Sequence, residues 1–533
     1  MEEALKTTGQ AGQVVAFVDI GTNSVRLLVV RINPNLSTTV ISQEKEVVRL
    51  GEHEFKDDIL RPEAMRRTVL VCRKFAELAK TYGATEIVAV GTSAIREARN
   101  QKDFLKQLMT EAGLNVHVIS GREEARLVYL GVSSGVDIGE EKAIFVDLGG
   151  GSTEIAIGNQ YKWCYLDSLR FGSIRLTAEF IGEGWTGPVP NHVYEHIKRY
   201  VRSNMFRTTA RVKQSKAKLA FGSSGTIINL AEITNRMFKN NENGRNQVLS
   251  KKNLKKMVPI LCSSSLNERK KIHGINPERA DIIIAGAAIT ETLMEEFELD
   301  EITVSYKGLR DGLLVDYLSR FEGFRDFQKT PVRSRSVLQL GRSFDFDEKH
   351  SETVASLATQ LFDSGKKAGL HDLGEEEREL LKYGAILHDI GDFLSFNDHH
   401  LHAHYIISNA ELLGFDQRET AIMANLARFH RKKFPTKKAL KGTGLDEHTK
   451  EIVIILSAFL RIAEKLDRSH CGLVKKVEFK EVEKDRILLS LFSDQDCSLE
   501  EWSVDQNAQA FHAAFGKKLD VCSVKRSCEV SLP

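Results

Sequence analysis

The sequence predicts an α/β protein of two similar lobes, followed by an all-α domain and a small α/β cap. The lobes are predicted because residues 18–27 and 146–155, 128 positions apart, share one pattern. Each has an apolar strand ending in Asp, a Gly/Ser turn and a second apolar strand. The all-α domain is predicted because apolar residues recur with helical spacing from Glu348 to about Ser469. The segment after it mixes strand and helix patterns, which predicts the cap.

Each hairpin opens a unit of interleaved strands and helices. In lobe I, placed at residues 1–135, the patterns predict a strand–turn–strand at 14–32, a helix at 63–82, a strand at 86–90, a helix from Ala94, a strand at 116–119 and a helix at 123–131. In lobe II, placed at residues 136–317, they predict a hairpin at 143–158, a loop at 221–226 leading into a helix, a helix at 279–297 and a strand at 301–305. The repeat indicates two homologous lobes with a cleft between them.

Residues 318–344 are interpreted as a linker because they are rich in Arg, Ser and Phe, contain Pro331 and show weak periodicity. The all-α domain is placed at residues 345–470 and the cap at 471–533. Within the cap, the patterns predict strands at 476–482, 486–492 and 519–524 and a helix at 499–515.

The composition is that of a soluble globular protein, with 42% hydrophobic and 28% charged residues among 533. The net charge of +2 indicates no polyanion partner for the molecule as a whole. The longest apolar run, Ile452 to Leu460 with one Ser, is too short to span a membrane. The first residues lack a signal-peptide pattern, and the seven cysteines form no C-x-x-C pair. Reduced thiols, a cytoplasmic location and no membrane partner are therefore expected.

The two turns are candidate phosphate cradles. Glycine lets the backbone approach a ligand closely and point its N–H groups inward, which suits phosphate oxygens. An Asp at the strand end, Asp19 or Asp147, can hold a cation or its waters. A single Asp-x-Gly turn is more often an ordinary hairpin. Two copies in register at Val, Asp, Gly and Ser favour a pair that grips a phosphate chain from both sides.

Glu124 is the candidate catalytic base. It lies where a strand delivers two carboxylates to the first turn of a helix. A carboxylate there can orient water and take its proton during attack on a terminal phosphoryl group. The alternative is that an acidic residue simply favours a helix N-terminus. Arg26, Arg96 and Arg310 are candidates for binding phosphoryl oxygens, with surface salt bridges as the alternative for each.

These residues resemble those of the exopolyphosphatase/guanosine-pentaphosphate phosphohydrolase family, within the actin–sugar-kinase–chaperone superfamily. The resemblance covers roughly residues 14–320 in the expected order. The matching stretches are Val18–Leu28, Gly91–Arg96, Ile119–Gly131, Val146–Gly158, Phe221–Asn229, Ile284–Thr290 and Gly308–Leu313. The resemblance implies two ribonuclease-H-like lobes of the actin and sugar-kinase type, and a homodimer is expected from it alone.

The resemblance further implies a hydrolase that releases terminal orthophosphate from inorganic polyphosphate with a divalent metal. Glu124 would be the catalytic base, Asp147 and Glu154 would hold metal and water, and Arg96 would bind phosphate. The turn amides would bind further phosphates; these belong to Gly21, Thr22, Asn23, Ser24, Gly149, Gly150, Gly151, Ser152 and Thr153. Because carboxylates offer only oxygen ligands, Mg²⁺ is the expected metal.

The all-α domain carries His350, His388, Asp389 and Asp467, whose order resembles the metal phosphohydrolase superfamily named for its His-Asp pair. On separate helices these residues can converge on one divalent metal, so a second metal site is expected. Further histidines that could serve another metal or bind phosphate are His399, His400, His402, His404 and His430. Long exopolyphosphatases carry a domain of this ancestry that can be degenerate and only bind polyphosphate. The other alternative is that His350 and His388 are satisfied core histidines.

A basic run in the all-α domain is predicted to line a polyphosphate channel. Its residues are Arg428, His430, Arg431, Lys432 and Lys433, continuing to Lys437, Lys438 and Lys441. A long polyanion spaces its charges regularly, so such a run would hold it in register and favour processive cleavage. The alternatives are a solvated face and nucleic-acid binding, and no RNA or DNA motif supports the latter.

The sequence therefore predicts an exopolyphosphatase. Guanosine pentaphosphate is the alternative substrate because it shares the terminal phosphoanhydride, although no guanine-reading motif is evident. A nucleotide phosphohydrolase acting through the His-Asp-type domain is a further alternative. An ATP-dependent kinase or ATPase and a non-catalytic sensor are the other classes. Glu124 at a helix start favours water as the acceptor, and intact Asp147 and Glu154 argue against a sensor.

Overall fold

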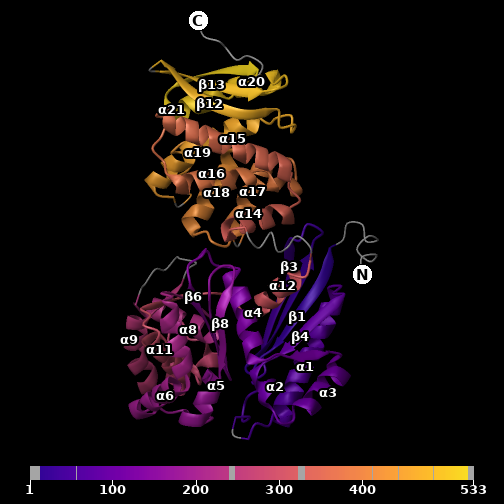
Figure 1. Cartoon of the computed structure of the whole chain (residues 1–533), viewed down its shortest axis with the longest axis vertical. Helices are drawn as coiled ribbons and strands as arrows, with labels where there is room; N and C mark the ends of the chain where they lie inside the picture. The colour runs from indigo at the N-terminus through magenta and orange to yellow at the C-terminus, as the bar shows by residue number, and fades with distance from the viewer. Residues whose placement is uncertain are drawn as a thin grey trace. The chain divides into compact units, whose positions relative to one another are not determined.

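The computed structural model divides into two compact units, with unit 1 ending at Val332 and unit 2 beginning at Arg333 (Figure 1). The structure describes residues 12–525 apart from Lys56, 239–246, 322–329, Glu411, Gly442, Gly444 and Lys484. In this described part of the chain, no helix has the length and apolar character needed to cross a membrane.

Lobe I is a five-stranded mixed sheet with the strand order β3-β2-β1-β4-β5. The strands are β1 (Gln13–Ile20), β2 (Ser24–Ile32), β3 (Thr38–Val47), β4 (Glu86–Gly91) and β5 (Val116–Val118). The helices are α1 (Pro62–Thr81), α2 (Ser93–Glu97), α3 (Gln101–Ala112) and α4 (Gly121–Ser133). Residues 14–18 of β1 are all apolar because both sheet faces are covered. Val14, Ala16 and Val18 belong to one buried cluster, while Val15 and Phe17 point into another on the opposite face.

Lobe II repeats this topology, as the duplicated hairpin predicts. Its six strands are ordered β10-β11-β9-β6-β7-β8. They are β6 (Ala143–Leu148), β7 (Thr153–Gly158), β8 (Trp163–Leu169), β9 (Leu219–Ser223), β10 (Val248–Ser250) and β11 (Glu301–Val304). The first three strands are antiparallel neighbours, and β6, β9 and β11 run parallel, as β1, β4 and β5 do. The lobe's helices are α5 (Ser173–Leu176), α6 (Asn191–Asn204), α7 (Phe206–Ser215), α8 (Gly225–Phe238), α9 (Lys251–Ser263), α10 (Leu266–Arg269) and α11 (Ile283–Glu296).

Helix α12 (Leu309–Leu318) corrects the predicted boundary of lobe II at residue 317, because it packs against lobe I. Leu313 and Tyr317 share a buried cluster with Val15 and Phe17 of β1. With α4, this helix lies between the two sheets in Figure 1. Sequence order places this segment in lobe II because it follows β11 directly. The order alone does not reveal that the chain returns to lobe I.

The α4–α12 contact depends on two glycines that let the helix backbones touch. A Cβ on Gly131 would lie 2.0 Å from the carbonyl oxygen of Gly308. A Cβ on Gly312 would lie 1.8 Å from the carbonyl oxygen of Leu127. Neither backbone can yield as a flexible side chain would, so any larger residue must push the helices apart.

Unit 2 begins inside the predicted linker, which is a second correction. α14 (Val332–Ser343) occupies the end of residues 318–344, and residues 322–329 lie outside the described residues. Val337 is fully buried in the unit 2 core. The helical period was obscured because arginines occupy the flanks of this helix, where Arg333 pairs with Glu419. Pro331 precedes the helix, as expected for a residue at a helix start.

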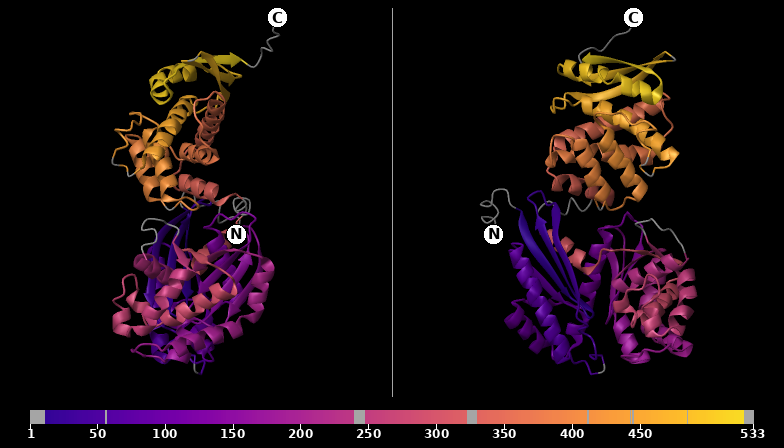
Figure 2. Two further views of the ribbon diagram at one scale, coloured as in Figure 1. Left: turned by 90° about the vertical axis from the view of Figure 1, so that its left-hand side faces the viewer. Right: turned by 180° about the vertical axis from the view of Figure 1, so that it is seen from behind.

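The helical part of unit 2 and its cap share one core. The helices are α15 (Glu348–Lys367), α16 (Glu375–Ile386), α17 (His399–Asn409), α18 (Gln417–Phe429) and α19 (Glu447–Lys465). The cap contains a sheet ordered β12-β13-β14, formed by Val474–Glu483, Arg486–Ser493 and Lys518–Lys525. The predicted helix at 499–515 is divided into α20 (Ser498–Asp505) and α21 (Ala508–Phe515). Figure 2 shows the sheet as a layer at one end of the helices.

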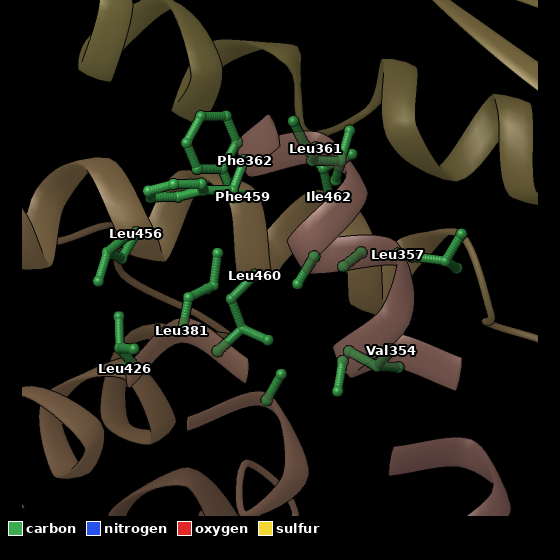
Figure 3. Packing of buried hydrophobic residues seen from close by; sticks show 14 of the residues in the cluster. Val354, Leu357, Leu361, Phe362, Leu381, Leu426, Leu456, Phe459, Leu460 and Ile462 are labelled. Carbon is green, nitrogen blue, oxygen red and sulfur yellow. The ribbon is translucent and has the colours of Figure 1, made fainter. Parts of the chain in front are cut away.

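Apolar side chains from four helices meet in this core. Figure 3 shows Leu361 and Phe362 of α15 beside Phe459 and Ile462 of α19, with Leu426 of α18 nearby. The same buried cluster includes Phe479, Leu489 and Phe511 of the cap. The sequence periods divide 345–470 from 471–533, whereas in the structure both segments bury their apolar faces together.

We expect Gly312→Ala to destabilise unit 1 because the new methyl group would collide with the α4 backbone. The free energy of unfolding should fall by about 2–3 kcal/mol, the upper range for an overpacked core. Urea unfolding measures this change. Gly135→Ala is the matched control, because the nearest atom to its Cβ would be Cγ of the flexible Lys307 side chain at 3.1 Å, and the nearest backbone atom, the Val132 carbonyl oxygen, lies at an ordinary contact distance of 3.7 Å. An equal effect from both variants would contradict the close backbone contact.

Candidate active site

The two glycine turns face each other across a cleft of about 480 Å³ between the lobes. The backbones of the two turns approach each other very closely. A Cβ on Gly150 would lie 3.2 Å from Thr22 Cβ, and a Cβ on Gly151 would lie 3.0 Å from Thr22 Oγ1. Glycine is therefore required in the second turn by the approach of the first.

Four carboxylates gather at the cleft or directly behind its wall, and three of them, Asp19, Glu124 and Glu154, are buried. Asp19 pairs across its hairpin with Arg26, and Asp147 pairs in the same register with Glu154. Asp147 Oδ1 accepts a hydrogen bond from Ser223 Oγ at 2.6 Å, and Glu154 Oε1 accepts one from Ser168 Oγ at 2.8 Å. Asp19 Oδ1 is buried with no hydrogen-bond partner among the described residues.

Glu124 completes this group from the first turn of α4. The Ser120 hydroxyl caps the helix by accepting a hydrogen bond from the Glu123 backbone N–H. The Glu124 side chain is only 9% exposed, and its Oε2 accepts a hydrogen bond from Arg96 Nη1 at 2.8 Å. Arg96 also donates to the carbonyl of Ile119, which places the guanidinium behind the carboxylate.

Burial raises the pKa of all four carboxyl groups. It raises the pKa of Glu124 to about 7 against the opposing pull of Arg96, and that of Asp19 to about 6. The pKa of Asp147 is raised chiefly by burial. The pKa of Glu154 is raised well above its ordinary value by burial and by the charges of Glu124 and Asp147. Such crowding of anions is compensated when a cation binds among them.

Cationic side chains line the same cleft and would face an anionic substrate. They are Arg26, Lys45, Arg279, Lys307 and Arg310. Burial, followed by the charge of Arg26, lowers the pKa of Arg279 to about 10. Burial also lowers the pKa of Arg310, whose Nη1 donates to the Leu27 carbonyl. Because positive side chains held close together repel one another, they favour the binding of a negatively charged phosphate chain.

Most of the predicted phosphate and catalytic residues line the cleft. They are Glu124, Asp147, Arg26, Arg310 and the turn residues Gly21, Thr22, Asn23, Ser24, Gly149, Gly150, Gly151 and Ser152. Three predicted residues lie elsewhere. Arg96 contacts Glu124, Glu154 lies behind the cleft wall at 1% exposure, and the buried Thr153 hydroxyl donates to the Phe171 carbonyl.

Some cleft residues were absent from the predicted set. Asp19 had only the general expectation that an Asp at a strand end can hold a cation or its waters, and it lines the cleft as its repeat counterpart Asp147 does. Lys45, Arg279 and Lys307 had no local signal, since three separate parts of the chain bring them to the cleft. Tyr306, an exposed aromatic residue, also lines it.

In unit 2 the predicted metal ligands are brought together in part. His350, His388 and Asp389 lie with their ligand atoms within 4.8 Å of one another. Asp467 differs from the prediction, because its Oδ2 contacts His350 Nδ1 at 2.8 Å and its Oδ1 accepts the Gly472 N–H. Asp467 therefore orients His350 from behind.

The predicted polyphosphate channel also changes. His430 is 1% exposed and lies in the interior, so it is not part of a surface run. Lys432 pairs with Asp398, and Arg431 lies over the Phe396 ring. A channel formed by the remaining basic residues stays a prediction.

Comparison with known proteins identifies the class of this cleft. Residues 28–321 match the Ppx/GppA phosphatase family, and residues 332–508 match Ppx/GppA phosphatase, domain III. The guanosine-5'-triphosphate,3'-diphosphate pyrophosphatase of Vibrio atlanticus (strain LGP32) is 29% identical over 438 residues, which are 80% of this chain and 83% of that protein.

Solved structures give the same class. An exopolyphosphatase from Cytophaga hutchinsonii is 26% identical with a TM-score of 0.53, covering 58% of this chain and 98% of that chain. An exopolyphosphatase-like protein is 26% identical with a TM-score of 0.52, over the same shares of the two chains.

The protein is thus a phosphatase that hydrolyses phosphoanhydride bonds. It belongs to the Ppx/GppA phosphatase family. This membership decides against the kinase and sensor classes. The domain III match covers the helical part of unit 2 and part of the cap, in agreement with the core that they share. The assignment to the His-Asp superfamily stays a prediction.

We expect Arg96→Gln to shift the pH dependence of hydrolysis. A base acts only when ionised, so activity should rise with pH through about 7, the pKa of Glu124. Arg96 lowers that pKa, and its removal should raise the pKa further and move the rising limb to higher pH. A kcat pH profile measures the shift.

The control for this variant is Arg99→Gln, three residues away and exposed. Its pH profile should match that of the unaltered enzyme. A profile for Arg96→Gln that falls in height without moving along the pH axis would contradict the role of Arg96 in setting the Glu124 pKa.

Proposed function

We propose that the unit 1 cleft is an exopolyphosphatase site, which releases terminal orthophosphate from inorganic polyphosphate. The observation that carries the proposal is the position of Glu124, a buried carboxylate with a pKa of about 7 inside a cleft lined by five cations. A group with this pKa is half ionised near neutral pH, where it accepts a proton efficiently. The similar exopolyphosphatase from Cytophaga hutchinsonii supports the substrate.

In the proposed reaction, Glu124 orients a water molecule in line with the terminal phosphorus. The water oxygen bonds to phosphorus, the bond to the bridging oxygen breaks, and the Glu124 carboxylate receives the proton. Orthophosphate and a chain shorter by one phosphate leave. The turn amides and Arg26, Arg279 and Arg310 hold the phosphate oxygens and offset their charge, which is the main demand of phosphoryl transfer.

We infer that Mg²⁺ assists at the carboxylate group. The residues fit this ion, because Asp19 Oδ1 is buried without a described hydrogen-bond partner, and Asp147 and Glu154 add further oxygen atoms. When bound, Mg²⁺ would neutralise charge on the phosphate oxygens and on the crowded carboxylates. Asp19, Asp147 and Glu154 would hold it directly or through water.

Guanosine pentaphosphate is the second candidate substrate. The relative from Vibrio atlanticus, which aligns with 80% of this chain, is named for a guanosine pentaphosphate. The cleft also continues past the turns to Asn229, Glu232 and Tyr306, where a carboxylate and an exposed ring offer contacts to a nucleoside. Polyphosphate needs neither contact.

A substrate comparison should distinguish the two candidates. Under Mg²⁺, phosphate release from long-chain polyphosphate is expected to exceed release from guanosine pentaphosphate and from ATP, measured as kcat/KM for each. A higher value for guanosine pentaphosphate would replace the first proposal with the second. A preference for ATP would overturn both.

Glu124→Gln should reduce phosphate release by at least about 10²-fold, the lower bound for removal of a general base. Polyphosphate binding should persist, because the amide keeps the shape of the carboxylate while losing its basicity. Glu123→Gln is the matched control: Glu123 pairs with Arg126 at 2.6 Å and its side chain is 39% exposed. Retained activity in Glu124→Gln would remove this residue as the base.

A further inference from the structure

The three glycine carbonyls of the second turn all accept hydrogen bonds from the chain at the start of α5. The contacts are Ser173 N–H to Gly149 O at 3.0 Å, Ile174 N–H to Gly150 O at 2.9 Å and Arg175 Nε to Gly151 O at 2.9 Å. A carbonyl group that is paired in this way cannot rotate without losing its partner. These contacts therefore hold the peptide groups of the turn in one orientation.

The N–H groups of the same peptides point in the opposite direction. In a trans peptide the N–H is antiparallel to the C=O, so the N–H groups of Gly150, Gly151 and Ser152 point away from α5. All three residues line the cleft. Among the described residues, these N–H groups have no hydrogen-bond partner. Successive N–H groups of this kind form a concave site that suits phosphate oxygens.

Arg175 holds the last of these peptides and also reaches into lobe I. Its side chain is 9% exposed, and its Nη2 pairs with Glu97 Oε2 of α2 at 2.7 Å. The guanidinium carbon lies 4.1 Å from the centre of the Phe55 ring, which also belongs to lobe I. Neither Arg175 nor Glu97 is among the residues that line the cleft. Arg175 can therefore affect a bound substrate only through the turn that it holds.

The peptide that Arg175 holds also lies against lobe I. A Cβ on Gly151 would lie 2.7 Å from Ser93 Oγ, 3.0 Å from Thr22 Oγ1 and 3.2 Å from Phe55 Cζ. Ser93 Oγ in turn donates to Glu97 Oε1 at 3.3 Å. The turn, the arginine and the carboxylate thus form one connected group that spans the two lobes.

The charges of this group make Glu97 the ionised partner of Arg175. Burial alone would raise the pKa of Glu97, but the charges of Arg175 and Arg170 outweigh it and lower that pKa. A second carboxyl group close to Arg175, that of Glu54, is buried, and neither of its oxygens has a hydrogen-bond partner among the described residues. Burial raises the pKa of Glu54 to about 8, so this group is mostly protonated at neutral pH.

We propose that Arg175 is a positioning residue for phosphate binding, which directs the Ser152 N–H toward the substrate and ties this orientation to lobe I through Glu97. The inference rests on the proposed function only in that the turn amides bind phosphate oxygens, whichever phosphate chain is the substrate. A guanidinium suits this role because it presents several N–H donors in a fixed geometry. Nε serves the Gly151 carbonyl, and Nη2 serves the Glu97 carboxylate.

The test is the KM of Arg175→Lys for long-chain polyphosphate under Mg²⁺. Lysine keeps the charge opposite Glu97, but its single nitrogen cannot reproduce the two fixed contacts. KM should rise at least about tenfold, as for a lost hydrogen bond to a charged group, while kcat changes little. The rising limb of the kcat pH profile should stay near pH 7, because Arg96 and not Arg175 contacts Glu124. A lower kcat with an unchanged KM, the result of a smaller folded fraction, would overturn the proposal.

Arg170→Gln is the matched control for this variant. Arg170 Nη2 pairs with the same Glu97 oxygen at 2.6 Å, but its side chain is 69% exposed and it makes no described contact with the turn. Its KM should match that of the unaltered enzyme. An equal rise of KM in Arg170→Gln and Arg175→Lys would show that the charge beside Glu97 matters and not the orientation of the turn, and would overturn the proposal.

The connection to lobe I is tested by binding, in a Glu124→Gln background that slows hydrolysis. Glu97→Gln and Arg175→Lys should each weaken the binding of long-chain polyphosphate. The two together should bind no more weakly than Arg175→Lys alone, because both substitutions break the same connection. Fully additive losses would overturn the role of Glu97. If the Glu124→Gln protein binds guanosine pentaphosphate and not polyphosphate, the proposed substrate is wrong, and the same comparison with guanosine pentaphosphate decides the role of Arg175.

Discussion

The structure of unit 1 depends on the crowding of four carboxylates, three of them buried, where two sheets meet. Asp19 and Asp147 end equivalent strands, Glu154 faces Asp147 across its hairpin, and Glu124 arrives from α4. Each would repel the others in a dry site. The Arg96 guanidinium beside Glu124 and the hydroxyls of Ser168 and Ser223 offset this repulsion. Catalysis in this family's fold is therefore inseparable from charge balance.

The sequence predicted the architecture of the lobes because the duplicated pattern indicates a strand–turn–strand hairpin and shows that this hairpin occurs twice. The register in the structure pairs Asp19 with Arg26 and Asp147 with Glu154, the positions that the repeat aligns. What it could not predict was set by the tertiary path of the chain. α12 belongs to lobe II by position yet packs on lobe I, and Arg96 meets Glu124 because β4 and β5 end side by side.

The histidines of unit 2 show the same limit, because sequence spacing does not reveal which of them lie close to Asp389. Sequence spacing singled out His350, His388 and Asp389, whose order follows a known pattern. His399 and His430 could not be told from His400, His402 and His404 by spacing, because only the fold of unit 2 brings their ligand atoms close to Asp389. Basic neighbours placed His430 in a surface run, whereas the turn after α18 directs it inward. Asp467 lies beside His350 and supports that histidine.

Helix α4 has a mechanical consequence. One side of it packs with β1 of lobe I through Leu127, and another packs with β6 and β7 of lobe II through Val128 and Tyr129. A rotation that opens the cleft must turn about such a shared element, and displacement is smallest near the axis. Glu124, on the first turn of that helix, would therefore stay nearly still while the two phosphate-binding turns swing apart. The proposed base would then be a fixed point to which each new substrate end is brought.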